Sequence, residues 1–408
     1  MRWLGIITLG ALFGLGACSS NGEAPTDDDG SGGSGGAGQG GAGGSGGVGP
    51  DACLAQWSNG VFEVDPQGPD TQIHATSAFD GTTIWVAYSR PDGGSLFDNY
   101  LVGMACDRSL VAGPTEVTQS DDNELDPVVS VSGDRLIVAW TSDNGTGGTS
   151  NLDIRYRIYD LAGTPVTDAL ELAASRNGMP VTGNALDPAL FPTDEGWRMA
   201  GAWGHDDAPG FQAFVVAIDR DGVVQGDAED ADLDPQVGQT RPAVAVDGAG
   251  VHLVWQEDTV MGMFPEAWAR PPGGAATLLA SPGARPDVAP GPWFAWDGDG
   301  SDVVVRTPAG SDVPLGLAGL VHNPSLAVAE GGAAISWMAL VSGIDNRVQV
   351  ARLGDTGELG PAHALGTDQV PSVYPIDLTM IDADHGVVVY QDGDNPAFRV
   401  KAELFTLP

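Results

Sequence analysis

Positive charge is the scarcest feature of this 408-residue chain. It has a single lysine, Lys401, and 16 arginines against 55 aspartates and glutamates, which gives a formal net charge of -38. Nucleic acids and anionic lipid surfaces attract basic proteins, so this balance excludes both as partners bound through charge. We expect no nucleic-acid partner, and contact with a membrane only through an anchor.

Cysteine is also scarce, whereas glycine and proline are abundant. The chain has 3 Cys, 60 Gly and 29 Pro, and 42% of its residues are hydrophobic. Turn-forming residues between short apolar runs favour strands joined by turns over helices. The length suits one large β domain or two ordinary ones. We therefore expect an all-β protein.

Residues 1–17 have the pattern of a secretion signal. One arginine precedes the apolar run 3–15, which is too short to cross a bilayer as a helix. The stretch Leu15-Gly16-Ala17-Cys18 resembles the lipobox of bacterial lipoproteins, and the resemblance implies cleavage before Cys18 and a lipid on its sulfur. An ordinary signal peptide followed by a chance cysteine is the alternative. Because Ser19 and not Asp follows Cys18, the resemblance implies an anchor in the outer membrane or at the cell surface.

Residues 18–50 form a polar tether. Gly occupies 13 of the 20 positions from Gly30 to Gly49, and no residue from 19 to 50 is aromatic. Such a segment cannot bury enough apolar area to offset the entropy of ordering it. We expect a flexible leash with an end-to-end distance of roughly 30 Å, followed by one folded domain over 51–408.

The domain over 51–408 is one repeated unit. In each copy, a proline is followed by alternating apolar and polar residues, a turn at Asp-Gly or Gly-Gly, and an aromatic anchor. Proline and anchor are 13 residues apart in Pro127 and Trp140, Pro242 and Trp255, and Pro324 and Trp337. The seven anchors are Tyr88, Trp140, Trp203, Trp255, Trp296, Trp337 and Tyr390.

Each copy continues with a third and usually a fourth alternating run, and this pattern resembles a β-propeller blade. The resemblance is to the architecture and to no characterised propeller subfamily. It predicts a single propeller of seven four-stranded blades, although six or eight would also fit the unequal spacing of the anchors. We expect a monomer.

The two ends of the domain favour closure of the ring. The last repeat has only three runs, and a fourth is available at 61–64, so an N-terminal strand would complete the last blade. With Cys18 lipidated, Cys53 and Cys106 remain, and an even pair in an exported chain predicts a disulfide. We expect this disulfide to cross the seam where the ring closes.

Polar residues just before the proline of each innermost strand, or in register with it, are the first candidate ligand site. Seven equivalent positions near the mouth of the central channel carry differing polar groups: His74, Asp126, Asp187, Arg241, Arg285, Asn323 and Tyr374. A ring with repeated geometry and unequal chemistry suits ligand recognition. The alternative is that these residues are held extended ahead of a proline and face solvent.

Loops after the aromatic anchors are the second candidate site, on the same face. Two of them place carboxylates at alternate positions of a tight turn, a spacing that suits calcium: Asp297, Asp299 and Asp302 in one, and Asp392 and Asp394 in the other. Asp-Gly is also a common dipeptide in hairpin turns. Calcium is therefore the only cofactor that the sequence suggests, and we expect no other.

Four arginines recur on the third strands of the repeats: Arg157, Arg270, Arg306 and Arg352. We expect them to pair with acids on neighbouring blades, with little gain in stability from each pair. Four further tryptophans, Trp85, Trp197, Trp268 and Trp293, are expected to pack between blades.

No catalytic motif stands out beyond residue 50, where GxSxG, HExxH and CxxC are all absent. We therefore expect a non-enzymatic binding or scaffold module of the cell envelope, with a protein or a glycan as its ligand. The competing hypothesis is an extracellular hydrolase or lyase acting on carbohydrate, with Asp126 and Asp187 as its acid and base.

Overall fold

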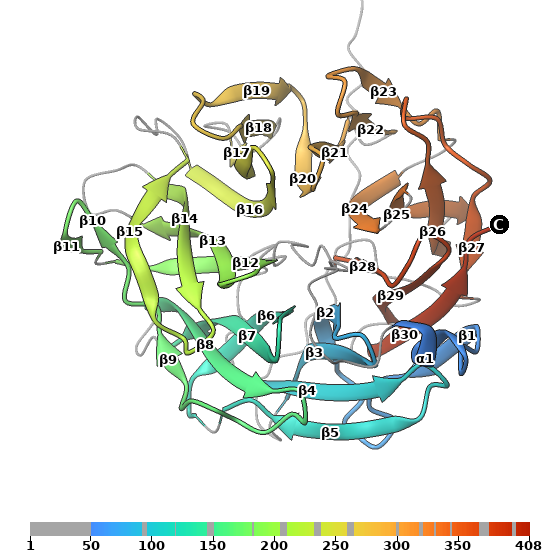
Figure 1. Ribbon diagram of the computed structural model, residues 1–408, viewed down its shortest axis with the longest axis horizontal. Helices are drawn as coiled ribbons and strands as arrows, with labels where there is room; N and C mark the ends of the chain where they lie inside the picture. Colours follow the sequence, from blue (N-terminus) through green and yellow to red (C-terminus); the bar gives the residue numbers. More distant parts are fainter. Residues whose placement is uncertain are drawn as a thin grey trace, which may run out of the picture. The chain divides into compact units, whose positions relative to one another are not determined.

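Each repeat of the sequence folds into one antiparallel sheet, and the seven sheets form a β-propeller (Figure 1). The predicted all-β fold with seven four-stranded blades is thereby confirmed, and the counts of six and eight are excluded. The computed structural model describes residues 50–91, 96–118, 120–144, 151–181, 183–204, 210–231, 238–258, 265–298, 302–317, 321–329, 332–342, 345–366, 375–393 and 397–408. The signal, Cys18 and nearly all of the tether lie outside these residues.

In each of the first four blades, chain order runs from the innermost to the outermost strand. Blade 1 contains β2 (Ile73–Phe79), β3 (Thr83–Pro91), β4 (Phe97–Ala105) and β5 (Leu110–Glu116). Blade 2 contains β6 (Asn123–Ser132), β7 (Arg135–Asp143), β8 (Leu152–Asp160) and β9 (Leu170–Glu171). Blade 3 contains β12 (Ala185–Thr193), β13 (Gly196–Gly204), β14 (Phe211–Asp219) and β15 (Val224–Asp230). Blade 4 contains β16 (Gly238–Asp247), β17 (Gly250–Asp258), β18 (Glu266–Arg270) and β19 (Thr277–Ala280).

The same order holds in blades 5 and 6 and is broken only in blade 7. Blade 5 contains β20 (Ala284–Ala289), β21 (Trp293–Asp297), β22 (Val303–Arg306) and β23 (Asp312–Pro314). Blade 6 contains β24 (Val321–Ala329), β25 (Gly332–Ser342), β26 (Asp345–Leu353) and β27 (His363–Leu365). Blade 7 contains β28 (Asp377–Met380), β29 (His385–Asp392), β30 (Arg399–Thr406) and the N-terminal β1 (Gly60–Glu63). A short hairpin of β10 (Ser175–Arg176) and β11 (Met179–Pro180) leads into blade 3.

The ring closes as predicted, with both ends of the domain in one sheet. Strand β1 pairs antiparallel with β30, from Gly60 opposite Leu404 to Glu63 opposite Lys401. The short helix α1 (Pro50–Leu54) precedes β1, and Cys53 in it forms a disulfide with Cys106 at the end of β4. The disulfide therefore joins the segment that completes blade 7 to blade 1, and the predicted seam disulfide is confirmed. Among the described residues, no helix is long and apolar enough to span a membrane.

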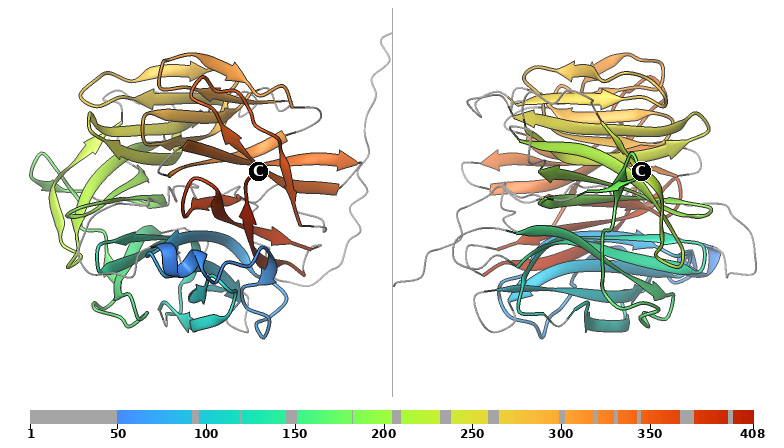
Figure 2. Two further views of the ribbon diagram at one scale, coloured as in Figure 1. Left: turned by 45° about the vertical axis from the view of Figure 1, so that its right-hand side comes forward. Right: turned by 90° about the vertical axis from the view of Figure 1, so that its left-hand side faces the viewer.

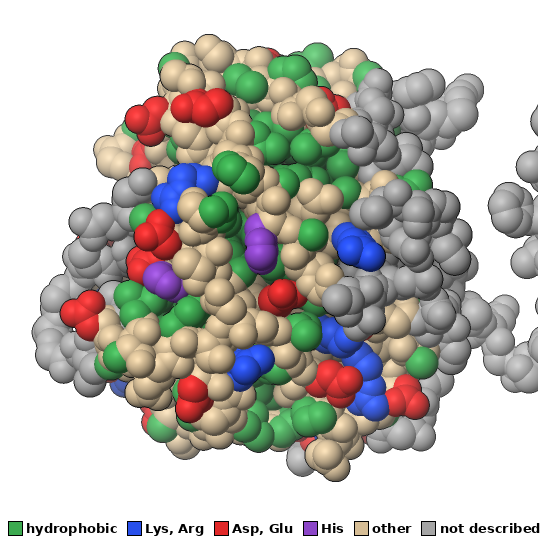
Figure 3. Space-filling model, turned by 90° about the vertical axis from the view of Figure 1, so that its right-hand side faces the viewer, with side chains coloured by type: hydrophobic (Ala, Val, Ile, Leu, Met, Phe, Trp, Pro, Cys, Tyr) green, Lys and Arg blue, Asp and Glu red, His purple; other side chains and the backbone are tan. Residues whose placement is uncertain are grey.

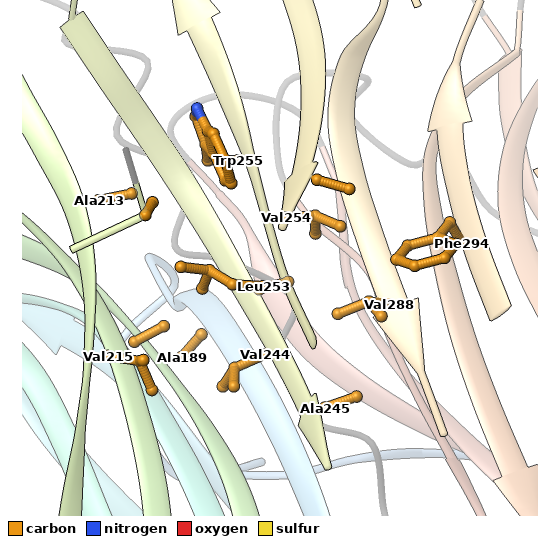
Figure 4. Close-up of a cluster of buried hydrophobic side chains, with 14 of the residues drawn as sticks. Ala189, Ala213, Val215, Val244, Ala245, Leu253, Val254, Trp255, Val288 and Phe294 are labelled. Atoms are coloured by element: carbon orange, nitrogen blue, oxygen red, sulfur yellow. The ribbon is translucent and has the colours of Figure 1, made fainter. Parts of the chain in front are cut away.

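Apolar side chains fill the spaces between blades. One such core joins Val215 of blade 3, Val244 and Leu253 of blade 4 and Val288 of blade 5 (Figure 4). All seven aromatic anchors are buried, and Trp85, Trp197 and Trp293 are buried in cores of the same kind. Each blade thus covers the apolar face of its neighbour, which is why the sheets are stable only as a ring.

The third blade departs from the predicted anchor pattern. In blade 2, Trp140 lies opposite a bulge in the innermost strand, whereas the pairing of Leu186 with Ala202 and of Ala189 with Ala200 puts Gly201 at that position. A Cβ on Gly201 would lie 2.7 Å from the Phe214 ring. Phe214 fills the space of the missing anchor, and Trp203 stacks on it with ring centroids 4.2 Å apart.

Seven hydrogen bonds, one in each seam, link an innermost strand to the preceding blade around the channel. The free edge of each innermost strand presents main-chain N–H groups with no strand partner, and such groups need acceptors. In every seam, a side chain of one blade accepts from an N–H of the next: Val129 N to Thr76 Oγ1 (3.1 Å), Asp187 N to Thr141 Oγ1 (3.2 Å), Arg241 N to Asp187 Oδ2 (3.1 Å), Arg285 N to Gln256 Oε1 (3.1 Å), Leu326 N to Asp287 Oδ2 (2.7 Å), Leu378 N to Ser325 Oγ (3.2 Å) and Ser77 N to Asp377 Oδ2 (2.8 Å). The last of these seams joins blade 7 to blade 1.

The third-strand arginines follow the predicted pairing only in part. Arg270 pairs with Glu229 of the preceding blade and Arg352 with Asp384 of the following one. Arg306 instead pairs with Asp312 in its own blade, and Arg157 donates to main-chain carbonyls, so the prediction was wrong for these two. Acidic and basic side chains lie side by side on the outer flank of the ring in Figure 3.

Candidate functional site

The predicted ring positions lie together at one face of the propeller. Strands run from one face to the other (Figure 2), and the ring residues sit near the start of each innermost strand. By antiparallel alternation, this face also receives the loops between second and third strands. Six of the seven ring residues are described, and Tyr374 lies outside the described residues. In blade 7, the pairing of Asp377 with Val389 places Pro375 at the equivalent position.

All six described ring residues have a left-handed backbone, with φ between +47° and +55°. They are His74, Asp126, Asp187, Arg241, Arg285 and Asn323. Each sits at a bulge, where the register of the innermost strand shifts against the second strand. The alternative, in which these residues are held extended, is therefore wrong for the six described residues, because the bulge turns each one into the left-handed region.

This conformation costs an L-residue about 1–2 kcal/mol and costs glycine almost nothing. The chain has 60 glycines, yet none occupies a ring position. Bulges and strained backbones of this kind cluster at binding and catalytic sites, where they direct a side chain. The ring therefore keeps its polar side chains at the expense of stability.

An acidic arc spans blades 1 to 3. His74 Nδ1 lies 2.6 Å from Asp126 Oδ1, and both Asp126 and Asp187 are buried. Burial raises the pKa of Asp187 to about 7, and the negative charge of Asp126 adds to this rise. Hydrogen bonding from Arg241 N opposes it without cancelling it. The arc thus holds one carboxyl beside a histidine and one that exchanges its proton near neutral pH.

A second arc, of mixed charge, spans blades 5 and 6. Arg285 Nη1 lies 3.2 Å from Asp297 Oδ2, and His322 Nδ1 lies 3.7 Å from the same oxygen. Asp297 is only 3% exposed. Asn323, next to His322, is also buried. This arc offers donors and acceptors but no isolated charge.

Three residues at this face were missed in the ligand ring: Thr141, Gln256 and Asp297. Each directly follows an aromatic anchor, and each contacts the ring through Asp187 N, Arg285 N or the Arg285 side chain. The signal that could have found them is a polar residue one position after the anchor. Asp297 had been considered only as a calcium ligand.

The carboxylates proposed for calcium have other partners where they are described. Asp297 contacts Arg285, Asp392 contacts Lys401, and Asp302 accepts from the N–H groups of Gly316 and Leu317. Asp299 and Asp394 lie outside the described residues. Over the described part of the chain, no three His, Cys, Asp or Glu side chains are grouped to hold a metal ion. Calcium binding stays a prediction.

Comparison with known proteins supports the architecture. No family model and no curated protein matches the chain. A protein of unknown function from Dyadobacter fermentans is similar in structure, with 11% identity and a TM-score of 0.53 over 86% of this chain and 100% of that one. An α-L-arabinofuranosidase of Fusarium graminearum is similar too, with 12% identity and a TM-score of 0.51 over 86% and 98%. At these identities, the likeness shows the fold alone.

The raised pKa of Asp187 predicts a stability that falls as the pH rises. Between about pH 4 and pH 7 the folded chain holds a proton on Asp187 that the unfolded chain has released, so the free energy of unfolding declines across this window. A shift of about 3 pH units corresponds to about 4 kcal/mol. Asp187→Asn, which can still accept from Arg241 N, should flatten the decline in urea unfolding measured from pH 4 to 8. Asp355→Asn, an exposed acid, should leave it unchanged, and an unchanged slope in Asp187→Asn would contradict the assignment.

Proposed function

We propose that this protein is a lipid-anchored lipoprotein of the outer membrane or cell surface whose propeller binds a glycan at the ring face. The observation that carries the binding proposal is the ring itself. Six polar residues are held in the left-handed region at equivalent bulges, where glycine would remove the strain. Their side chains are of four kinds, one histidine, two aspartates, two arginines and one asparagine, and such a mixture suits a site that recognises an asymmetric ligand.

The chemistry of the ring suits a sugar better than an extended apolar partner. Carboxyl, guanidinium, imidazole and amide groups gather at one face, and sugar hydroxyl groups both donate and accept hydrogen bonds. The Fusarium graminearum structure is a complex of an α-L-arabinofuranosidase with arabinobiose, so a protein of similar fold binds a glycan. The tether and lipid would hold the ring face near the envelope.

The anchor is tested by labelling the chain in a bacterial host. Wild-type protein should incorporate radiolabelled palmitate and fractionate with membranes. Cys18→Ser should lose the label and appear in the soluble fraction, because it has no sulfur to accept the lipid. Cys53→Ser serves as the control, since it should keep the label. Soluble, unlabelled wild-type protein would contradict the anchor.

Glycan binding is tested on the full chain in detergent with an array of neutral and acidic oligosaccharides. Arg241→Asn should weaken binding at least tenfold, because it removes a guanidinium from the ring while asparagine tolerates the left-handed backbone. Arg135→Gln, at the opposite face, should bind as the wild type does. If no glycan binds and pull-down recovers a protein partner that Arg241→Asn loses, the glycan proposal fails.

A second candidate function is glycoside hydrolysis, and one observation favours it. Asp187 is buried beside Asp126 and has a pKa of about 7, the value expected of a carboxyl that donates a proton at neutral pH. Asp126, which pairs with His74, would then act as the base of the pair. Inverting and retaining glycosidases both employ two such carboxyl groups.

Hydrolysis predicts release of reducing ends from at least one polysaccharide, with a rate that falls above about pH 7 as Asp187 loses its proton. Asp187→Asn and Asp126→Asn should each lower the rate at least a hundredfold. Asp355→Asn should leave it unchanged. Glycan binding without reducing-end release by the wild type would leave the protein as a binding module.

A further inference from the structure

The Arg285–Asp297 pair differs from an ordinary ion pair because one polar atom of each side chain lacks a hydrogen-bond partner among the described residues. Arg285 reaches Asp297 Oδ2 through Nη1 alone. Over the described part of the chain, the buried atoms Arg285 Nε and Asp297 Oδ1 have no hydrogen-bond partner. One pair therefore presents a donor and an acceptor that remain unsatisfied in a largely enclosed setting.

The Arg306–Asp312 pair, on the outer strands of the same blade, shows the contrast. There the guanidinium uses two nitrogens, with Arg306 Nε 2.6 Å and Nη2 2.9 Å from the two carboxylate oxygens of Asp312. Asp312 is 44% exposed at its side chain, whereas that of Asp297 is 4% exposed. The fully paired geometry thus occurs where water is available, and the half-paired geometry occurs in the enclosed site of the ring.

Unsatisfied polar atoms are uncommon in protein interiors, and each calls for a partner. An alcohol satisfies both atoms at once, since its hydroxyl hydrogen can be donated to a carboxylate oxygen while a hydroxyl oxygen accepts from a guanidinium N–H. Neighbouring hydroxyl groups on one sugar ring present this combination. A bound carboxylate could accept from Arg285 Nε but could not donate to Asp297 Oδ1.

We infer that Arg285 and Asp297 form a subsite for two neighbouring hydroxyl groups of a neutral sugar, within the glycan site proposed above and dependent on it. His322 Nδ1, 3.7 Å from Asp297 Oδ2, adds a third polar group to this subsite. An anionic sugar would bring a second carboxylate beside Asp297, which disfavours it at this subsite. The subsite therefore selects neutral sugars over uronates.

The backbone lets this subsite be altered without opening the ring. The seam hydrogen bond of Arg285 is made by its main-chain N–H to Gln256 Oε1, so changing the side chain preserves it. Asparagine tolerates the left-handed backbone, and it stands naturally at the equivalent position 323 in blade 6. Asp297→Asn keeps the shape of the side chain and removes the charge.

The test is titration calorimetry of the full chain in detergent with arabinotriose, xylotriose, cellotriose and trigalacturonate. At least one neutral trisaccharide should bind more tightly than trigalacturonate. Asp297→Asn and Arg285→Asn should each weaken that binding at least tenfold. Arg306→Asn and Asp312→Asn, the fully paired controls, should stay within twofold of the wild type. Thermal unfolding of each variant checks its fold, and if Asp297→Asn does not fold, Arg285→Asn decides alone.

Two outcomes would overturn the subsite: tighter binding of trigalacturonate than of every neutral trisaccharide, or binding by Arg285→Asn within twofold of the wild type. Either result would leave the proposed function standing if Arg241→Asn still loses binding on the array. Failure of the array itself would instead remove the proposed function. The two failures are thus distinguishable.

Discussion

The free edge of the innermost strand is the constraint on which this structure depends. A four-stranded blade has three pairs of neighbouring strands and leaves two edges free, and one of these presents a row of main-chain N–H groups to the channel, where no strand can reach. The chain meets this need with one side-chain acceptor in each of its seven seams, including the seam that joins the two ends of the domain. Apolar packing holds the blades together, and these bonds fix how each blade is set against the next.

In each seam, the acceptor binds one of two main-chain N–H groups of the next blade. The residue just beyond the bulge determines which of the two it is. Where the residue just beyond the bulge is polar, as at Thr76, Asp287, Ser325 and Asp377, it accepts from the third residue after the ring position of the next blade. Where that residue is Val128, Ala189 or Ala243, its side chain has no acceptor. The ring residue of the next blade then donates its main-chain N–H, and the acceptor is Thr141, Asp187 or Gln256. Blades 3 to 5 therefore engage their ring residues in closure. Asp187 takes part in two of these bonds, and its burial raises its pKa.

The sequence was sufficient to predict the blades because their signal is local. A proline, a turn and an aromatic residue 13 positions on describe one hairpin, and strand periodicity supplies the rest. The ring could be placed for the same reason, since four of its six described members stand 14 residues before their own anchor. What the sequence did not contain is the relation between blades. Gly201 can replace the anchor only because Phe214 fills the space. Arg306 pairs with Asp312 of its own blade. Asp297 belongs to the ring face only through its contacts with Arg285 and His322.

The same constraint explains why a sevenfold repeat can carry an asymmetric site. Closure asks for one acceptor per seam, and apart from Asp187, which accepts from Arg241 N, it leaves the chemistry of the described ring side chains free to differ. Blades 1 to 3 hold the histidine and the two buried carboxyl groups, while blades 5 and 6 hold the half-satisfied Arg285–Asp297 pair. These two groups lie on well-separated arcs of the ring (Figure 1). A ligand that spans them must match a proton donor at one end and a hydroxyl-binding pair at the other, and such a match demands a polyhydroxylated molecule of defined length and orientation.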